Sequence, residues 1–459
     1  MRPDQRGATN GRGFMGTPLL FLRMTLEMKT KLAFTSQMFA AVVLSSVLAT
    51  PASAENWPSW RGPRRDAVST ETGLPAKWSK AENVLWRAPL PGRGGSTPVI
   101  WEDRIFLTSV DGDDLKLLCF STGGKKLWER LLATGNRLVR ADEGDSAAPS
   151  PSTDGKHVWA FVTTGDLACY TVAGKQVWKI NLQERYGKFK IAFGMTSTPV
   201  VDGERIYLQL IHGEGNPTSR EAIVVALDNR TGQEIWKHDR KSDARGECEH
   251  SYASPTLYRD NQREFLITHG ADFTVGHDLA DGHELWRLGG LNPKGRYNAT
   301  LRFVSSPVVV PGMIVVPSAK GGPIVALRPG IKGDVTRARS AFHWNRRRNT
   351  PDVSSPLVHD GLVYTLTKVG GLICFDAKTG EDVYTERAGQ GRHRSSPAYA
   401  DGKIFLISRT GVVTVVKPGR KFEVLARNDM QEQMNASPAF SGGRMYLRTF
   451  DALYAIGKK

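Results

Sequence analysis

Short apolar runs alternate with polar turn sequences along most of the chain, and one stretch shows the pattern most clearly. Residues 223–227 are apolar and rich in β-branched side chains, residues 228–232 have the composition of a turn, and residues 235–236 begin a second apolar run. Aspartate in such a turn can accept hydrogen bonds from backbone amides two residues on, and glycine adopts positive φ without steric cost. The stretch from Ala226 to Trp236 is therefore predicted to be a β-hairpin.

The same eleven-residue frame recurs, which predicts a repeat protein. In each copy a small residue is followed by a turn that ends in glycine, and the frame closes on an aromatic residue. Looser copies end at other tryptophans, the last of them after an insertion. The defining positions are Ala226, Gly232, Trp236, Gly276, Gly282, Trp286, Cys374, Gly380 and Tyr384 in the full copies and Trp86, Trp128, Trp178 and Trp344 in the looser ones.

A proline followed by a tight turn marks the start of each predicted unit. These prolines are Pro98, Pro149, Pro199, Pro255, Pro307, Pro356, Pro397 and Pro438, at intervals of 41 to 56 residues. Intervals of this length are typical of four-stranded propeller blades, and proline is tolerated at the start of a strand. We therefore predict an all-β fold, a single eight-bladed β-propeller of four-stranded blades.

The two ends of the predicted propeller are each incomplete. The last unit stops after the apolar run 452–456 without a fourth strand, while residues 83–87 read as a fourth strand without the first three. We expect the N-terminal strand to pair into the C-terminal blade, because this closes the ring and removes a free sheet edge.

The frame Ala-x-Asp-x-x-Thr-Gly-x-x-x-Trp resembles the tryptophan-docking repeat of PQQ-type β-propellers. The resemblance covers residues 83–457 and is closest in type to non-catalytic secreted propellers of the BamB kind. It implies that the tryptophan of one blade packs against the neighbouring blade over the small residue that opens the frame. It also implies a binding or scaffold module rather than an enzyme.

The N-terminal 54 residues are predicted to lie outside the fold. From Met28 a charged start, an apolar stretch and a small-x-small site at residues 52–54 have the order of a secretory signal peptide, with cleavage after Ala54. Residues 1–27 are interpreted as a mis-called upstream extension, residues 55–82 as a leader packed on the outside of the ring, and residues 83–459 as the propeller. We expect a soluble monomer in the periplasm or outside the cell, without a transmembrane segment or a lipidated cysteine.

The formal net charge of +16 is typical of a solvated, soluble surface, and the alternative is attraction to an anionic partner. A cell-envelope protein or an anionic glycan fits this charge. A nucleic acid is not expected, because no motif interleaves basic and aromatic residues. Cys119, Cys169 and Cys374 lie at or near the small position of their frames, where a thiol acts as a small apolar side chain, so no disulfide is expected.

Candidate binding residues lie in the loops that join one blade to the next. In a propeller these loops meet at one mouth of the central channel, where ligands commonly bind. The alternative is that they are ordinary loop residues that satisfy one another. The predicted mouth residues are Asp145, Glu249, His250, Arg302, Asp352, Arg392 and His393.

No catalytic residue and no metal site can be assigned from the sequence. His250 and His393 lack metal-ligand spacing, and no Cys-x-x-Cys pair is present. The resemblance leaves open a PQQ- and calcium-dependent quinoprotein dehydrogenase, but the adjacent Cys-Cys pair of those enzymes is missing and their calcium ligands find no match. No cofactor is therefore expected. An enzyme acting on cell-wall material or polysaccharide is a second alternative.

Overall fold

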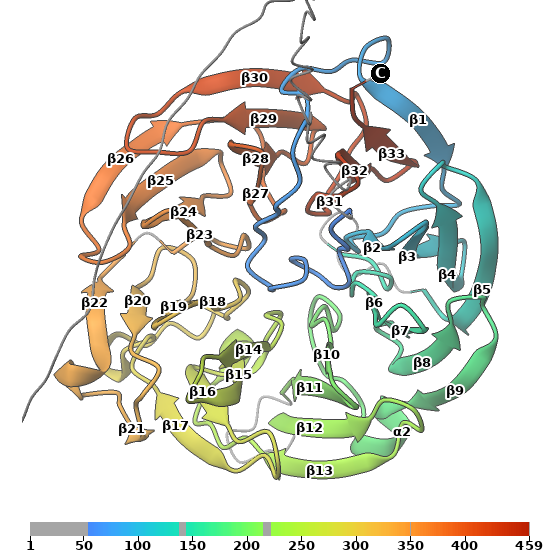
Figure 1. Cartoon of the computed structure of the whole chain (residues 1–459). Helices are drawn as coiled ribbons and strands as arrows, with labels where there is room; N and C mark the ends of the chain where they lie inside the picture. The colour runs from blue at the N-terminus through green and yellow to red at the C-terminus, as the bar shows by residue number, and fades with distance from the viewer. Residues whose placement is uncertain (1–53, 137–143, 214–221, 349, 459) are drawn as a thin grey trace, which may run out of the picture. The chain divides into compact units, whose positions relative to one another are not determined.

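The computed structural model describes residues 54–136, 144–213, 222–348 and 350–458, and their strands form eight sheets arranged in a ring (Figure 1). The eight-bladed β-propeller predicted from the sequence is thus confirmed. The predicted signal segment lies outside the described residues, apart from Ala54. No helix within the described ranges is long and apolar enough to cross a membrane.

Blades 1 to 4 follow one another along the chain as antiparallel meanders from the centre of the ring outward. Blade 1 comprises β2 (Val99–Trp101), β3 (Arg104–Asp111), β4 (Asp114–Ser121) and β5 (Lys126–Thr134); blade 2 β6 (Ser152–Thr153), β7 (His157–Phe161), β8 (Asp166–Thr171) and β9 (Gln176–Asn181); blade 3 β10 (Val200–Asp202), β11 (Arg205–Ile211), β12 (Ala222–Asp228) and β13 (Glu234–Asp239); and blade 4 β14 (Thr256–Arg259), β15 (Glu264–Gly270), β16 (Phe273–His277) and β17 (Glu284–Leu288).

The remaining blades continue the ring. Blade 5 comprises β18 (Val308–Val310), β19 (Met313–Pro317), β20 (Ile324–Leu327) and β22 (Phe342–Arg346); blade 6 β23 (Leu357–His359), β24 (Leu362–Leu366), β25 (Gly371–Asp376) and β26 (Asp382–Arg387); blade 7 β27 (Ala398–Ala400), β28 (Lys403–Ile407), β29 (Val412–Val416) and β30 (Val424–Asp429); and blade 8 β31 (Ala439–Ser441), β32 (Arg444–Arg448), β33 (Ala452–Ile456) and β1 (Val84–Pro89). Short helical turns are α2 (Leu182–Tyr186), η1 (Gly246–Glu249), η2 (Lys294–Arg296) and η3 (Arg339–Ala341).

The ring closes where the two ends of the propeller meet. Strand β1 pairs antiparallel with β33, and Trp86 lies opposite Ala455 in this pair. Blade 8 is therefore built from both ends of the sequence, as predicted. Because the last blade holds the first strand, separating blades 8 and 1 would require breaking a strand pair inside a sheet.

Tryptophan docking differs in one respect from the expectation. Ala226, which opens the frame of blade 3, lies opposite Trp236 of its own blade. The Trp236 ring packs instead on Gly282 of blade 4, where an added Cβ would lie 2.4 Å from the ring, and its indole N–H donates to the Leu279 carbonyl at 3.1 Å. Other docked pairs are Trp86 with Gly124, Trp128 with Gly174, Trp178 with Gly232 and Trp344 with Gly380.

The tryptophan therefore packs against the neighbouring blade, as expected, but the residue that it meets there is the turn glycine and not the small residue that opens the frame. The small residue and the tryptophan of one frame are cross-strand partners, so their side chains share a face of one sheet. The neighbouring blade instead contributes the glycine that ends its turn. Two small residues therefore make room for each docked indole ring. The residue that opens the frame lies opposite the tryptophan in its own blade, and the turn glycine contacts the ring from the next blade.

Blade 4 departs from this scheme because the frame of blade 5 carries the insertion. Strand β21 (Gly333–Asp334) lies within it and pairs in parallel with β17, so that Gly333 is the partner of Trp286. Trp286 is 1% exposed and packs in a cluster with Val335. The inserted segment thus covers the tryptophan that lacks a turn glycine in the next blade.

The start of blade 2 is displaced by two residues from its predicted position. Pro149 is the predicted start, and the sequence holds a second proline two residues later, Pro151. The Ser150 hydroxyl, however, takes the hydrogen bond from the Thr97 backbone N–H of blade 1 at 2.9 Å. Pro151 is therefore the counterpart of Pro98, because the hydroxyl before the proline sets the register between blades.

Residues 55–82 do not lie on the outside of the ring as expected. Trp57 exchanges two backbone hydrogen bonds with Ile100 of β2, and the Arg61 guanidinium donates to the Pro356 carbonyl just before β23, at 2.6 Å. The segment thus crosses the centre of the ring from blade 1 to blade 6 (Figure 1). Trp57 is fully buried, so the apolar side chains that the segment carries explain its inward path.

Candidate functional site

The inner strands of the eight blades surround a cavity of about 320 Å³. Its wall is a ring of hydroxyl groups, each from the residue before the proline that opens an inner strand. These residues are Thr97, Ser150, Thr198, Ser254, Ser306, Ser355, Ser396 and Ser437. The backbone N–H of each of these residues donates to the hydroxyl of the next residue in the series, from Thr97 to Ser150 through to Ser396 to Ser437. The donor–acceptor distances are 2.9 to 3.2 Å.

The leader supplies one wall of the cavity through Trp60. The Trp60 side chain lines this cavity and also a second one of about 20 Å³, which is bounded by Ser59, Arg61 and Arg65 of the leader. Trp60 therefore separates the central cavity from the space beneath the leader. The charged side chains of the cavity come from the loops between blades and from the turn between β24 and β25.

A carboxylate flanked by two cations lies in the lining. Asp352 Oδ2 is 3.6 Å from Lys368 Nζ and 3.7 Å from an Arg394 guanidinium nitrogen. Both separations are ion-pair distances but too long for hydrogen bonds. The Lys368 side chain is 36% exposed, and among the described residues this ion pair is the interaction found for its ammonium group. The ammonium can therefore accept a further anionic partner.

One side of the lining consists of the Phe193 and Tyr252 rings with Arg302 packed against them. Its guanidinium carbon lies 4.5 Å from the Phe193 ring centroid and 5.8 Å from that of Tyr252, and it donates to Glu247 of η1. Phe193 and Tyr252 pack edge to face at 5.7 Å. Burial raises the pKa of Tyr252, although Arg302 opposes that shift, so the phenol is neutral at physiological pH. This side of the cavity combines a held cation with apolar rings.

Asp145 lies at the cavity wall, and the buried Arg448 guanidinium is close enough to act on its charge. Burial raises the pKa of Asp145, against the effects of the Arg448 guanidinium and of the Ala147 N–H, which donates to its carboxylate at 2.9 Å. Burial also lowers the pKa of Arg448 to about 10, and its guanidinium donates to the Ser96 hydroxyl and the Thr108 carbonyl at 2.8 Å each. The hydrogen bonds of Arg448 tie blade 8 to blade 1, and its positive charge partly offsets the effect of burial on Asp145.

The structure brings together three of the seven predicted mouth residues. Asp145, Arg302 and Asp352 line the cavity. The other four, Glu249, His250, Arg392 and His393, are absent from its lining.

The side chains outside the lining have other surroundings. His393 is 1% exposed, its ring lies against Gly389 and Gly370, and burial lowers its pKa to about 4. Glu249 is buried, and its side chain packs where a Cβ of Gly213 would stand. Burial also lowers the pKa of His250, despite the nearby Glu249. Side chains of this kind belong to the packing of the loops.

Sequence reasoning missed Lys368, Arg394 and Trp60. Arg394 follows His393 in the same loop, so the correct loop was chosen but the side chain that faces the cavity is one residue further on. Lys368 lies in a turn between two strands of one blade, and such turns were not considered. Trp60 was assigned to a leader that was expected elsewhere. The Trp-Pro-Ser-Trp sequence of that leader was the signal that could have indicated a packed segment.

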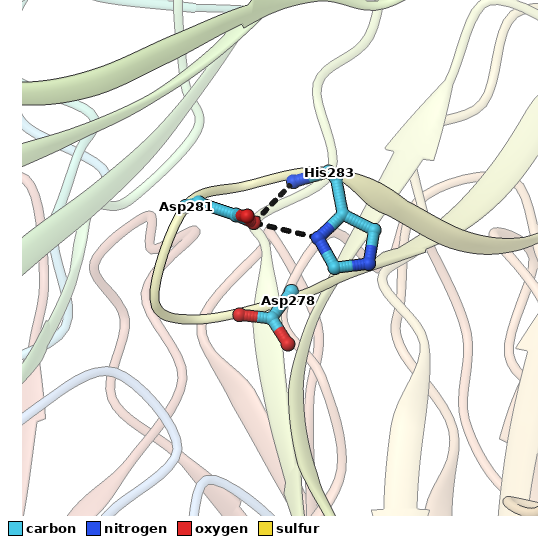
Figure 2. Close-up of side chains that lie close together, drawn as sticks. All are labelled: Asp278, Asp281 and His283. Carbon is cyan, nitrogen blue, oxygen red and sulfur yellow. Dashed lines mark hydrogen bonds and ion pairs between the residues drawn. The ribbon is translucent and has the colours of Figure 1, made fainter.

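One group of side chains with metal-ligand chemistry occurs within the described ranges, and it lies apart from the cavity. Asp278, Asp281 and His283 meet in the turn between β16 and β17 (Figure 2). Asp281 Oδ1 already accepts from the backbone N–H and the ring Nδ1 of His283, at 3.0 and 2.6 Å, and Asp278 Oδ1 accepts from the Ala280 N–H at 2.7 Å. These contacts are those of a hydrogen-bonded turn.

The described side chains of the cavity do not fit a calcium-bound quinone cofactor. Calcium requires six to eight oxygen ligands, with carboxylates and amide carbonyls among them. The carboxylates of the lining are Asp145 and Asp352, and each faces a cation of the protein. Asn435 is the one amide side chain among the described residues of the lining. This donor set lacks the concentrated negative charge that a divalent cation needs.

The sequence matches the family model described as outer membrane protein assembly factor BamB, over residues 63–215 and 121–386. Among curated proteins, none is significantly similar to the chain in sequence.

Solved structures share the architecture. BamB from Moraxella catarrhalis has a TM-score of 0.61 at 14% identity, covering 82% of this chain and 99% of that one. The quinohemoprotein alcohol dehydrogenase ADHIIG from Pseudomonas putida HK5 has a TM-score of 0.58 at 12% identity, covering 88% and 80%. The computationally designed Ika8 protein has a TM-score of 0.55 at 12% identity, covering 85% and 99%. At these identities the likeness shows the fold alone.

Proposed function

The chain belongs to the PQQ-repeat propeller family whose model is that of outer membrane protein assembly factor BamB, and from this premise we propose that it is an exported, non-catalytic binding module of the cell envelope. Its partner is a protein that inserts an acidic segment into the mouth of the central cavity. The family supports a protein partner in the envelope, and the charge of the cavity supports an acidic one.

One observation carries the proposal. Lys368 and Arg394 both face Asp352 at distances beyond hydrogen bonding, and Lys368 is partly exposed beside them. A partner carboxylate can reach the Lys368 ammonium and gain charge-assisted hydrogen bonds that Asp352 does not make. Val369, the next residue of the same turn, is an apolar side chain that is 55% exposed. An exposed apolar side chain beside a cation that can still donate hydrogen bonds is typical of a protein-binding surface.

The Phe193, Tyr252 and Arg302 side of the cavity suits the remainder of such a segment. Aromatic rings provide apolar contact area at little cost in conformational entropy. Arg302 is held between Glu247 and the rings, so it serves as a fixed cation. The hydroxyl ring adds donors and acceptors deeper in the cavity.

The experiment places a photo-crosslinking residue at position 368 or at position 156 of the full chain in cells that export it. Lys156 is an exposed lysine in the turn between β6 and β7, whereas Lys368 lies in a turn at the other ends of the strands. We expect a discrete adduct with one envelope protein from position 368 and none from position 156. Arg394→Glu should weaken the adduct several-fold, because a carboxylate there repels an acidic partner.

Equal adducts from both positions, or none from position 368, would contradict the proposal. An adduct that is unchanged by Arg394→Glu would show that the partner binds without the cations of the cavity.

A further inference from the structure

A half-buried carboxylate of the leader accepts three backbone N–H groups. The Glu55 nitrogen donates to Glu71 Oε1 at 2.7 Å, the Gly442 nitrogen donates to the same oxygen at 2.9 Å, and the Gly443 nitrogen donates to Oε2 at 2.5 Å. Within the described part of the chain no cation forms an ion pair with Glu71. The described partners of its negative charge are therefore backbone dipoles.

The turn in blade 8 is shaped for this carboxylate. Gly442 and Gly443 join β31 to β32, and their φ angles are 62° and 67°. Positive φ at both central residues of a two-residue hairpin is the geometry that favours glycine at both positions. Successive N–H groups then point to the same side and form a small anion-binding concavity. Glu71 fills it, and this anchors the leader to the propeller.

The side chain of Glu55 is held in place as well as its backbone nitrogen. Its carboxylate accepts from the Ser69 hydroxyl at 2.8 Å, from the Thr70 N–H at 2.9 Å and from the Arg64 guanidinium at 2.9 Å. Burial opposes ionisation, but these bonds outweigh it and hold the pKa of Glu55 below its ordinary value. Both the nitrogen and the side chain of Glu55 are thus fixed in space by residues 64–71.

We propose that the chain is processed between Ala54 and Glu55, and that Glu71 is the receptor for the α-ammonium group created there. A signal peptidase adds water across the Ala54–Glu55 bond. The C–N bond breaks, Ala54 leaves with a carboxylate, and the Glu55 nitrogen becomes a protonated amine. The nitrogen stands 2.7 Å from Glu71 Oε1, so the new ammonium supplies the cation that this carboxylate lacks.

Processing therefore strengthens the docking of the leader. Before processing, the Glu55 amide donates to the carboxylate as a neutral group, whereas the ammonium adds the attraction between opposite charges. Because Glu71 also binds the turn of blade 8, the ammonium, the leader and the closing blade form one connected unit. This inference rests on the export assumed in the proposed function but not on any property of the cavity.

The test begins with the full chain produced in an exporting cell, whose mature N-terminal residue is identified by mass spectrometry. We expect Glu55. The mature protein is then treated at pH 7 with an amine-acylating reagent, and the acylation rate of the α-amine is compared with that of Glu71→Gln. A paired ammonium resists deprotonation, so we expect the variant to react about tenfold faster, which corresponds to one pKa unit. Glu82→Gln, an exposed leader position, serves as the control and should react like the unaltered protein.

If Glu71→Gln folds poorly, a variant with a glycine inserted between Ala54 and Glu55 provides a second measurement of the acylation rate. It moves the amine one residue away from Glu71, so acylation should again accelerate. A mature terminus other than Glu55, or equal acylation rates in all proteins, would overturn the inference. An unprocessed chain would overturn both this inference and the export in the proposed function. Loss of the adduct from position 368 with normal processing would contradict the proposed function alone.

Discussion

Single glycines fix how neighbouring blades meet. The turn glycine under each docked tryptophan has positive φ, as Gly380 does at 74°, and it also lies in contact with the ring of the preceding blade. A side chain at such a position faces two separate costs, one from the backbone and one from the ring. The requirement for glycine is therefore stronger at this position of the frame than at an ordinary turn.

Blade 6 allows these two costs to be separated. An added Cβ at Gly380 would lie 2.8 Å from Trp344, whereas at Gly361, with φ of 70°, nothing lies within 4 Å. We expect Gly361→Ala to lower the free energy of unfolding by about 1 kcal/mol through backbone strain, and Gly380→Ala by about 2 to 4 kcal/mol. Thermal unfolding of the two variants measures the difference. Equal melting temperatures would show that docking does not depend on the glycine.

Buried neutral histidines predict acid sensitivity. Burial lowers the pKa of His269 and His277 to about 3, and that of His212 and His393 to about 4. The unfolded chain binds protons at these sites below about pH 6.5, while the folded protein does not. Their contribution to stability is thus fully present above pH 6.5 and is lost as the pH falls toward the folded pKa values.

We expect the free energy of unfolding, measured by denaturant titration, to fall by at least about 2 kcal/mol between pH 7 and pH 5. Carboxylates with lowered pKa values titrate mainly below this window. His393→Asn should make the free energy of unfolding depend less steeply on pH, because it removes one of the four buried histidines. A flat profile from pH 7 to pH 5 would contradict the burial of these rings as neutral groups.

At the scale of elements, the leader behaves as an internal part of the propeller. It contacts blade 1 through Trp57, passes the cavity at Trp60 and reaches blade 7, where the Trp78 N–H donates to Asn428 Oδ1 at 3.0 Å. Trp57 is fully buried and meets Phe440 edge to face at 5.4 Å. The leader joins strands that are far apart in the ring and therefore resists their separation.

Replacement of two leader tryptophans should have unequal effects. Trp57→Ala empties a fully buried site and should cost about 3 to 5 kcal/mol, whereas Trp60→Ala removes a side chain that borders a cavity and should cost about half as much. Melting temperatures of the full chain and the two variants provide the comparison. If Trp57→Ala melts like the unaltered protein, the leader does not contribute to the stability of the ring.

At the scale of the whole molecule, a propeller of this kind can serve as a binding module or hold a cofactor. The ring of eight hydroxyls, linked by seven hydrogen bonds, makes the cavity a rigid feature of the fold. What differs between such proteins is the set of side chains that loops and leader place around it. Here the carboxylates are matched by protein cations.

Titration with PQQ and calcium should therefore give no saturable change in quinone absorbance and no shift in melting temperature. A cofactor present at 100 times its dissociation constant would stabilise the protein by about 2.7 kcal/mol, which thermal unfolding detects readily. A saturable shift would instead favour the quinoprotein dehydrogenase and call for a screen of alcohols and sugars with an artificial electron acceptor.

The sequence by itself determined the architecture, because the signals are local. Each full copy of the frame specifies a hairpin within eleven residues by a small residue, an aspartate turn, a glycine and an aromatic side chain, and the eight prolines that open the units give the number of blades. Even the closure of the ring followed from counting strands at the two ends. Pro149 shows the limit of this reasoning, since two prolines fitted the spacing and a hydrogen bond from blade 1 chose the other.

Only the tertiary structure decided which side chains face the cavity. In the loops between blades no strict alternation fixes side-chain direction, so His393 packs against glycines while Arg394, the next residue, lines the cavity. The path of the leader was equally undetermined, because it depends on contacts with Ile100 and Pro356, distant in sequence. Strand patterns arise from neighbours along the chain, whereas the site arises from packing between segments that meet only in the closed ring.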